Sequence, residues 1–183
     1  MHLLSWRGPK ITARVITISA LFLALKIVVG FIPAIGSAQL VQIGLGFLVT
    51  APMGYYLGPW LSGIILVFDD IISNTIFNFG GSMFFPGYTF SSLISGIIAG
   101  AFLYQQKPTL KRIFTYMFVQ ILISNVILGT LWLVMMGVSS ILTPVPFAIR
   151  MLKEVVTWPI EAIVVYYLLN SLLKARLERY IYQ

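Results

Sequence analysis

The chain has 183 residues, of which 59% are hydrophobic and only 9% are charged, and its mean hydropathy is +0.96. A soluble domain of this size needs roughly a quarter of its residues charged to cover its surface, so the composition excludes that class and indicates an integral membrane protein. The chain has no cysteine and a single histidine, His2. These counts argue against a thiolate metal site and against Ser-His or Cys-His catalysis. We therefore expect no metal, no other cofactor and no enzymatic activity.

Six apolar stretches have, or nearly have, the length of a transmembrane helix, which needs about 20 apolar residues. They cover approximately residues 12–31, 40–57, 60–77, 88–104, 113–136 and 147–174. The pair Gly58-Pro59 separates the second stretch from the third, and such a pair is typical of a turn. The sequence therefore predicts an all-α membrane protein in which residues 1–183 form a single domain of six transmembrane helices.

The positions of the basic residues predict the orientation of these helices. Three precede the first span, three lie between the fourth and fifth spans, and three follow the sixth: Arg7, Lys10, Arg14, Lys107, Lys111, Arg112, Lys174, Arg176 and Arg179. The linkers after the first, third and fifth spans carry no charge. Because positive residues concentrate on cytoplasmic loops, we expect both termini to be cytoplasmic.

Ionisable residues inside the spans are candidates for a functional site, because each costs about 2.5 to 3.5 kcal/mol to insert. Arg150 and Lys153 are three residues apart on one helical face, near the expected outer end of the sixth span. They would attract an anionic ligand, although they could instead reach lipid headgroups. For Lys26 and Glu161 we expect structural pairing inside the bundle, for instance of Lys26 with a glutamate of the sixth span.

Asp69 and Asp70 lie near the middle of the third span. Adjacent helical residues point about 100° apart, so we expect one carboxylate to face the bundle centre and the other to bond a neighbour. A buried carboxylate pairs well with a guanidine-like edge that offers two neighbouring N–H donors, as a pterin does. The sequence leaves open which of the two aspartates makes such a contact.

Aromatic residues gather at the expected outer ends of the spans. Phe84, Phe85 and Tyr88 lie in a glycine-containing loop, and Trp132 lies at the end of the fifth span. Such residues usually form an interfacial belt, but a glycine-hinged loop would also suit a lid that stacks on a flat ring. Asn125 shares a helical face with Trp132, and an interior asparagine needs a polar partner.

Pairs of small residues four apart occur in two spans and allow close approach between helices. Ala20 and Ala24 form one pair, in the first span, and Gly96 and Gly100 form the other, in the fourth. For the glycine pair we expect packing within the bundle.

Three segments together resemble the folate-family substrate-binding (S) components of energy-coupling factor (ECF) transporters. They are Phe-Phe-Pro-Gly-Tyr-Thr at 84–89, Leu-Gly-Thr-Leu-Trp-Leu at 128–133, and Arg150-x-x-Lys153 followed by Pro159. The likeness extends over nearly the whole chain. The family often has asparagine where this chain has Gly129, and Asn125 offers an amide one turn earlier.

The resemblance implies a multi-pass protein of the bacterial cell membrane that binds folate from outside and lacks catalytic activity. It also implies association with a transmembrane coupling (T) component and two cytoplasmic ATPases, with Ala20 and Ala24 facing the coupling subunit. The substrate-binding residues would be Asp69, Asp70, Phe84, Phe85, Tyr88, Asn125, Thr130, Trp132, Arg150 and Lys153. The pterin edge would meet an aspartate, and the anionic tail would meet Arg150 and Lys153. Alternatives are an S component for pantothenate, thiamine or a hydroxymethylpyrimidine, and a structural membrane subunit.

Overall fold

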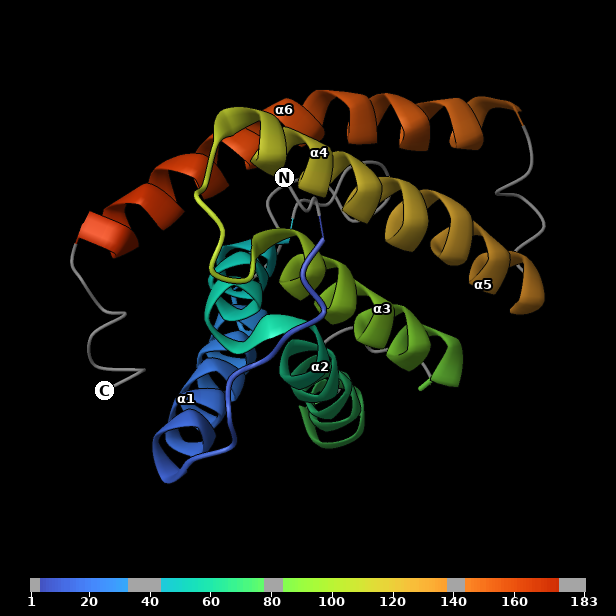
Figure 1. Ribbon diagram of the computed structural model, residues 1–183. Helices are drawn as coiled ribbons and strands as arrows, with labels where there is room; N and C mark the ends of the chain where they lie inside the picture. The colour runs from blue at the N-terminus through green and yellow to red at the C-terminus, as the bar shows by residue number, and fades with distance from the viewer. Residues whose placement is uncertain (1–3, 33–43, 78–83, 138–143, 175–183) are drawn as a thin grey trace.

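The computed structural model describes residues 4–32, 44–77, 84–137 and 144–174, except for the side chains at 144–146, 149 and 150. Within these ranges every regular element is a helix (Figure 1). In chain order the elements are α1 (Ala13–Gly30), α2 (Phe47–Ile72), the π-helical η1 (Ser73–Phe77), α3 (Pro86–Leu103), α4 (Leu110–Gln120), the π-helical η2 (Ile121–Leu128), α5 (Gly129–Met135) and α6 (Pro144–Lys174). The predicted all-α class is confirmed for this part of the chain.

Five helical stretches of the described chain are long and apolar enough to cross a membrane. They are Ala13–Gly30, Phe47–Phe77, Pro86–Leu103, Leu110–Met135 and Met151–Lys174. Four correspond to expected spans, whereas Phe47–Phe77 joins the expected second and third spans into one helical stretch. Large apolar side chains on these helices are widely exposed, as lipid-facing residues are, and Tyr167 is 67% exposed.

The α2 helix is interrupted at Gly58, where the backbone leaves the helical conformation with φ 72° and ψ −177°. The Ser62 hydroxyl donates a hydrogen bond to the Met53 carbonyl oxygen over 3.1 Å. Nine residues of straight α-helix would separate these groups by roughly 13.5 Å. The helix therefore folds back at Gly58 into a first arm (residues 47–57) and a second arm (residues 59–72). The break therefore lies at the Gly58-Pro59 pair, as the sequence predicts.

The two arms of α2 pack closely against α3 because small residues line the contact. A Cβ atom on Gly54 would lie 2.6 Å from the Ala99 carbonyl carbon, and one on Gly96 or Gly100 would overlap the backbone of α2. The expectation that Gly96 and Gly100 serve helix packing is confirmed.

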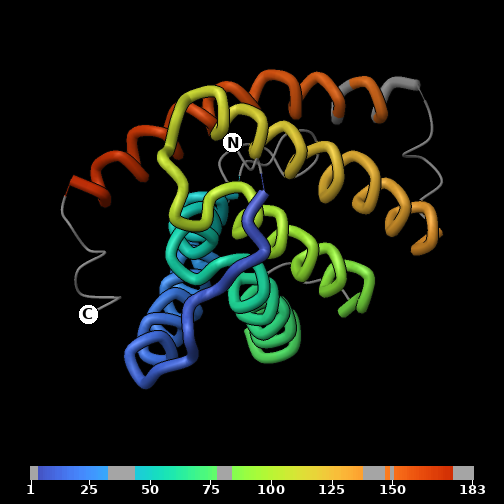
Figure 2. Tube along the Cα trace, viewed as in Figure 1, coloured from blue at the N-terminus to red at the C-terminus, as the bar shows by residue number. Residues whose placement is uncertain are grey.

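The helices form layers on either side of α3 (Figures 1 and 2). On one side lies α2, with α1 packed against it. On the other side α4, η2 and α5 form one continuous run beside α6, and the Trp158 indole N–H donates to the Phe114 carbonyl oxygen over 3.1 Å. This arrangement leaves polar space between the α2 layer and the α4–α6 layer.

Candidate functional site

A cavity of about 360 Å³ lies between α2, α3 and the η2–α5 run. Its lining combines one carboxylate, several hydroxyl and amide groups, and two aromatic rings. We call it the aromatic cavity; its lining residues are Asp70, Asn74, Phe85, Tyr88, Ser91, Ser92, Ser95, Ser124, Asn125 and Gly129. Four predicted site residues, Asp70, Phe85, Tyr88 and Asn125, therefore meet at one cavity.

The Asp70 carboxylate is held by hydrogen bonds from two elements. Thr89 of α3 donates its hydroxyl to Oδ2 over 2.6 Å, and the Asn74 side chain donates to Oδ1 over 3.1 Å. A carboxylate has about four lone-pair sites, so these bonds fix its orientation and leave acceptor capacity toward the cavity. The geometry suits recognition of a ligand that presents neighbouring N–H donors.

Aromatic side chains form the wall beside Asp70. The Phe85 ring centroid lies 6.0 Å from that of Tyr88 and 5.8 Å from that of Trp132. The Trp132 indole N–H donates to the Ser91 hydroxyl over 2.8 Å. Gly87 permits this cluster, because a Cβ atom there would lie 2.6 Å from the Trp132 ring. Trp132 therefore supports the wall from α5.

A second cavity, of about 340 Å³, adjoins the first and shares Ser92, Ser95 and Asn125 with it. We call it the charged cavity, because its lining includes the ionisable side chains of Lys26, Asp69, Lys153, Glu154 and Glu161. The adjacent aspartates thus face different cavities. This differs from the expectation that only one would face the bundle interior, and the reason is that the interior space is divided in two.

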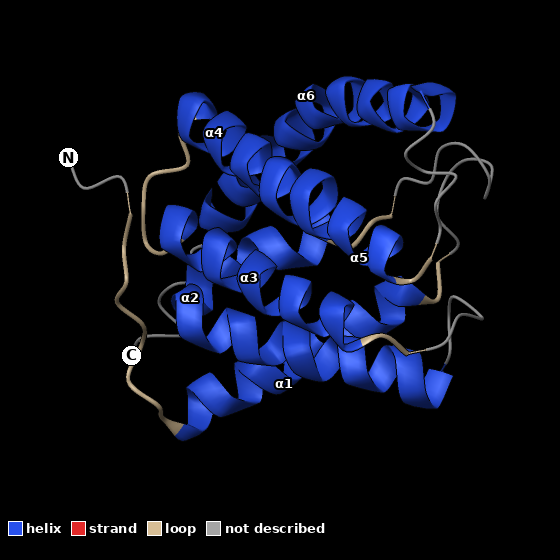
Figure 3. Cartoon of the chain, turned by 90° about the vertical axis from the view of Figure 1, so that its right-hand side faces the viewer, coloured by secondary structure: helices blue, strands red, loops and turns tan. Residues whose placement is uncertain are grey.

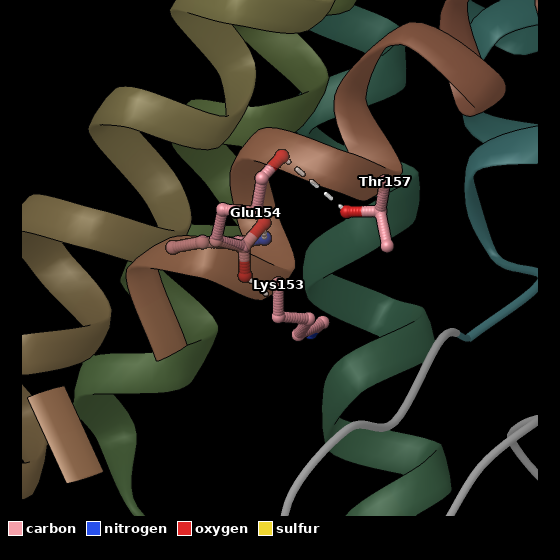
Figure 4. Close-up of polar contacts among 4 residues, drawn as sticks. Lys153, Glu154 and Thr157 are labelled. Atoms are coloured by element: carbon pink, nitrogen blue, oxygen red, sulfur yellow. Dashed lines mark hydrogen bonds and ion pairs between the residues drawn. The ribbon is translucent and has the colours of Figure 1, made fainter. Parts of the chain in front are cut away.

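Lys153 enters the charged cavity from α6 beside Glu154 (Figure 4). Its Nζ atom lies 3.4 Å from Glu154 Oε1, and the Asn125 amide donates to Glu154 Oε2 over 3.2 Å. Asn125 therefore links the two cavities to α6. The polar partner that the sequence predicts for Asn125, on a neighbouring helix or on a ligand, includes the Glu154 carboxylate of α6.

Lys26 also lines the charged cavity, but its partners are not the expected ones. Its Nζ atom donates to the Gly46 carbonyl oxygen and to the Thr50 hydroxyl, each over 3.0 Å. The predicted pairing with a glutamate of the sixth span is therefore wrong for the contacts that the structure describes. The Gly46 carbonyl oxygen and the Thr50 hydroxyl, at the start of α2, lie within hydrogen-bonding distance of Lys26 Nζ and take the ammonium group.

The other predicted site residues lie outside the described linings of both cavities. Phe84 is 38% exposed and precedes α3. Thr130 follows Gly129 in α5, and its buried hydroxyl has no hydrogen-bond partner among the described residues. Arg150 belongs to α6, and its side chain is outside the described part of the chain. Ala20 and Ala24 are both exposed on α1, away from the cavities.

Sequence reasoning missed the hydroxyl and amide groups that separate the cavities. Ser95 and Ser124 hydrogen-bond each other over 2.9 Å, and the Gln120 amide donates to Ser124 over 3.2 Å. Ser91, Ser92 and Ser95 fall within little more than one turn of α3, and that density of polar residues in an apolar helix is the signal that was available.

The arrangement is built for binding a polar, partly aromatic small molecule. Two adjoining cavities of a few hundred Å³ match the size of a cofactor-sized ligand. No group of three or more metal-ligating side chains occurs within the described ranges. Polar hydrogen-bonding groups, ring faces and charged side chains are therefore what this site offers a ligand.

Comparison with known proteins places this architecture among membrane transporters. The family model for the substrate-specific component of ECF transporters matches residues 14–182. A folate transporter FolT of Clostridium novyi (strain NT) is 33% identical over 127 residues, which are 69% of this chain and 72% of that protein. A second FolT, from Leuconostoc mesenteroides subsp. mesenteroides, is 29% identical over 176 residues, which are 91% of this chain and 90% of that protein.

A solved structure supports the same assignment. The crystal structure of FolT bound with folic acid superposes with a TM-score of 0.79 at 25% sequence identity. The match covers 87% of this chain and 95% of the FolT chain. The likeness therefore extends to nearly the whole helical arrangement.

Proposed function

Because the chain belongs to the family of substrate-specific components of ECF transporters, we propose that it binds folate at the membrane and delivers it inward. The chain is a multi-pass protein of the bacterial membrane. It is the substrate-specific component of a transporter, and not an enzyme. The similarity to two FolT proteins and to a folic acid-bound FolT supports folate as its substrate.

The observation that carries the site assignment is that Asp70 lines the same cavity as the aromatic rings of Phe85 and Tyr88. The pterin of folate has a flat ring and a donor edge, which Asp70 would accept while Phe85 and Tyr88 contact the ring. Asn125 would add an amide to the same edge or ring. Trp132 would keep the aromatic wall in place through Ser91.

The charged cavity offers a place for the remainder of the ligand. Folate continues from the pterin through an aryl linker to a glutamate with two carboxylates, and the two cavities adjoin at Ser92, Ser95 and Asn125. Lys153 lines the second cavity, and Arg150 lies three residues before it on α6. We assign the anionic tail to these two residues.

The topology and the partners belong to the same proposal. If each arm of α2 crosses the membrane, the helices make six spans with both termini cytoplasmic, as the basic residues favour. A transmembrane coupling component and two cytoplasmic ATPases would then complete the importer. The exposed alanines Ala20 and Ala24 on α1 would contact the coupling component.

A ligand panel on the purified full chain tests the function. We expect calorimetric titration in detergent to give saturable one-to-one binding of folate, and no binding of pantothenate, thiamine or a hydroxymethylpyrimidine. Saturable binding of one of those compounds without folate binding would overturn the assigned substrate. Binding of none would favour a structural membrane subunit, provided that the protein unfolds cooperatively on heating.

A further inference from the structure

Residues 4–10, which precede α1, form a strap across one end of the helices. The Ser5 backbone N–H donates to the Ala101 carbonyl oxygen near the end of α3 over 2.8 Å. At the turn between the α2 arms, a Cβ atom on Gly58 would lie 2.9 Å from the Arg7 carbonyl oxygen. The backbone of the strap is therefore packed against both α2 and α3.

Two tryptophans meet where the strap crosses the α2 turn. Trp6 of the strap and Trp60 of the second arm have ring centroids 6.1 Å apart, yet they are 57% and 56% exposed. Neither indole N–H has a hydrogen-bond partner among the described residues. Exposed tryptophans with free N–H groups are typical of the level of lipid headgroups.

This end of the bundle is strongly and exclusively basic among the described residues. Figure 3 shows that the N-terminal segment, the start of α1 and the α3–α4 connection lie at the same end. The cations of these segments and of the first turn of α4 are Arg7, Lys10, Arg14, Lys107, Lys111 and Arg112. The four acidic residues within the described ranges all line the two interior cavities instead.

Helix dipoles add to this positive field. Both α1 and α4 begin at this end (Figure 3), and Thr109 makes no side-chain hydrogen bond that caps α4. The first N–H groups of a helix carry partial positive charge and favour anions. The field therefore comes from side chains and backbone together.

We propose that Trp6, Trp60 and the adjacent strap cations form a binding surface for the headgroup of an anionic phospholipid. The phosphate accepts hydrogen bonds from the indole N–H groups and is attracted by Arg7 and Lys10. The indole rings lie against the upper acyl chains, beside the lipid-facing sides of the helices. The lipid is favoured over a protein partner because exposed apolar side chains continue from the strap and the residues before α1, at Leu4 and Ile11, into the membrane-spanning α1, at Ile16. The proposal does not depend on which ligand the cavities bind.

Native mass spectrometry of the purified full chain tests the surface. After incubation with equal amounts of phosphatidylglycerol and phosphatidylcholine, we expect the wild type to retain phosphatidylglycerol at least about fivefold more than phosphatidylcholine. The Trp6→Ala/Trp60→Ala variant and the Arg7→Gln/Lys10→Gln variant should each lose this preference. The use of two variants distinguishes loss of lipid binding from misfolding, because Arg7→Gln/Lys10→Gln leaves all packed apolar groups in place.

The matched control is the Phe31→Ala/Phe77→Ala variant. These rings form an exposed aromatic pair 5.2 Å apart at the other end of α1. Its removal should leave the preference for phosphatidylglycerol unchanged. Equal retention of the two lipids by the wild type would overturn the proposal. So would a tryptophan variant that keeps the preference but no longer assembles with the coupling component, since the surface would then serve a protein.

Discussion

The Thr89 hydroxyl donates a hydrogen bond of 2.6 Å to Asp70 Oδ2, and this contact joins α3 to the second arm of α2. Thr89 lies in the first turn of α3, directly after the glycine-containing segment that brings Phe85 and Tyr88 to the cavity. One bond therefore relates the orientation of the carboxylate to the position of the aromatic wall. The two components of the proposed pterin site are held together by it.

Removing this hydroxyl should weaken folate binding without unfolding the protein. A hydrogen bond to a charged group contributes about 1.5 to 3 kcal/mol, so Thr89→Val should reduce folate affinity by roughly tenfold or more. Thr89→Ser keeps the hydroxyl and should retain affinity within about threefold of wild type. Titration calorimetry of the two variants checks this. Equal affinity of Thr89→Val and wild type would show that Thr89 does not position Asp70 for the ligand.

The assignment of the anionic tail predicts a ligand-dependent effect. Pteroate lacks the glutamate of folate, so Lys153→Ala and Arg150→Ala should weaken folate binding by about tenfold and pteroate binding much less. Lys174→Ala, at the far end of α6, is the matched control and should change neither. Parallel titrations with the two ligands measure the difference. Equal losses for folate and pteroate would place these cations away from the tail.

The close approach of α3 to the α2 turn predicts a stability defect. A Cβ atom on Gly100 would overlap the backbone of Gly58 and Pro59, so Gly100→Ala should cost about 1 to 3 kcal/mol through overpacking. Gly44→Ala is the control, because no atom lies within 4 Å of a Cβ at that position. Thermal unfolding in detergent should show a lower midpoint for Gly100→Ala alone. An unchanged unfolding midpoint for Gly100→Ala would mean that α3 can move away from α2 without loss of stability, and would contradict this prediction.

The exposed positions on α1 predict a defect in assembly. Ala20→Trp and Ala24→Trp should block copurification with the coupling component while folate affinity stays near that of wild type, because neither side chain contacts the cavities. Leu25→Trp, on a different face of the exposed helix, is the control and should assemble. Loss of folate binding in the two alanine variants would instead place those alanines against the bundle.

Much of the fold follows from composition and local chemistry. Apolar runs of sufficient length predict the helices, and Gly58 predicts the reversal because its backbone requires a conformation that only glycine adopts readily. The glycines of α3 predict close packing for a different reason, because they carry no side chain and let the helix backbones approach each other. The observed helix α2 differs from the expected second and third spans only in that the turn between them is a single non-helical residue, Gly58.

The candidate site was predicted in part. Asp70, Phe85, Tyr88 and Asn125 are unusual enough in an apolar span, or at its end, to stand out from the sequence. The partners of Lys26 do not stand out in this way, since they are a backbone carbonyl and a threonine hydroxyl that only the three-dimensional path of the chain brings near. The serine groups between the cavities were missed because a serine is common in membrane helices and costs little, so that only their density in α3 sets them apart. Whether such a serine contributes to a site depends on which helix it faces in the folded protein.

The folate affinity of an Asp70→Asn variant, compared with that of Asp69→Asn, tests the central claim most directly. The two substitutions are chemically identical and adjacent, but Asp70 lines the aromatic cavity and Asp69 the charged cavity. Loss of a charge-assisted contact to the pterin edge should lower affinity by at least about tenfold for Asp70→Asn. Asp69→Asn should change it by less than about threefold on the same scale. Calorimetric titration that gives equal affinities for Asp70→Asn and wild type, or the larger loss for Asp69→Asn, would contradict the proposed pterin site.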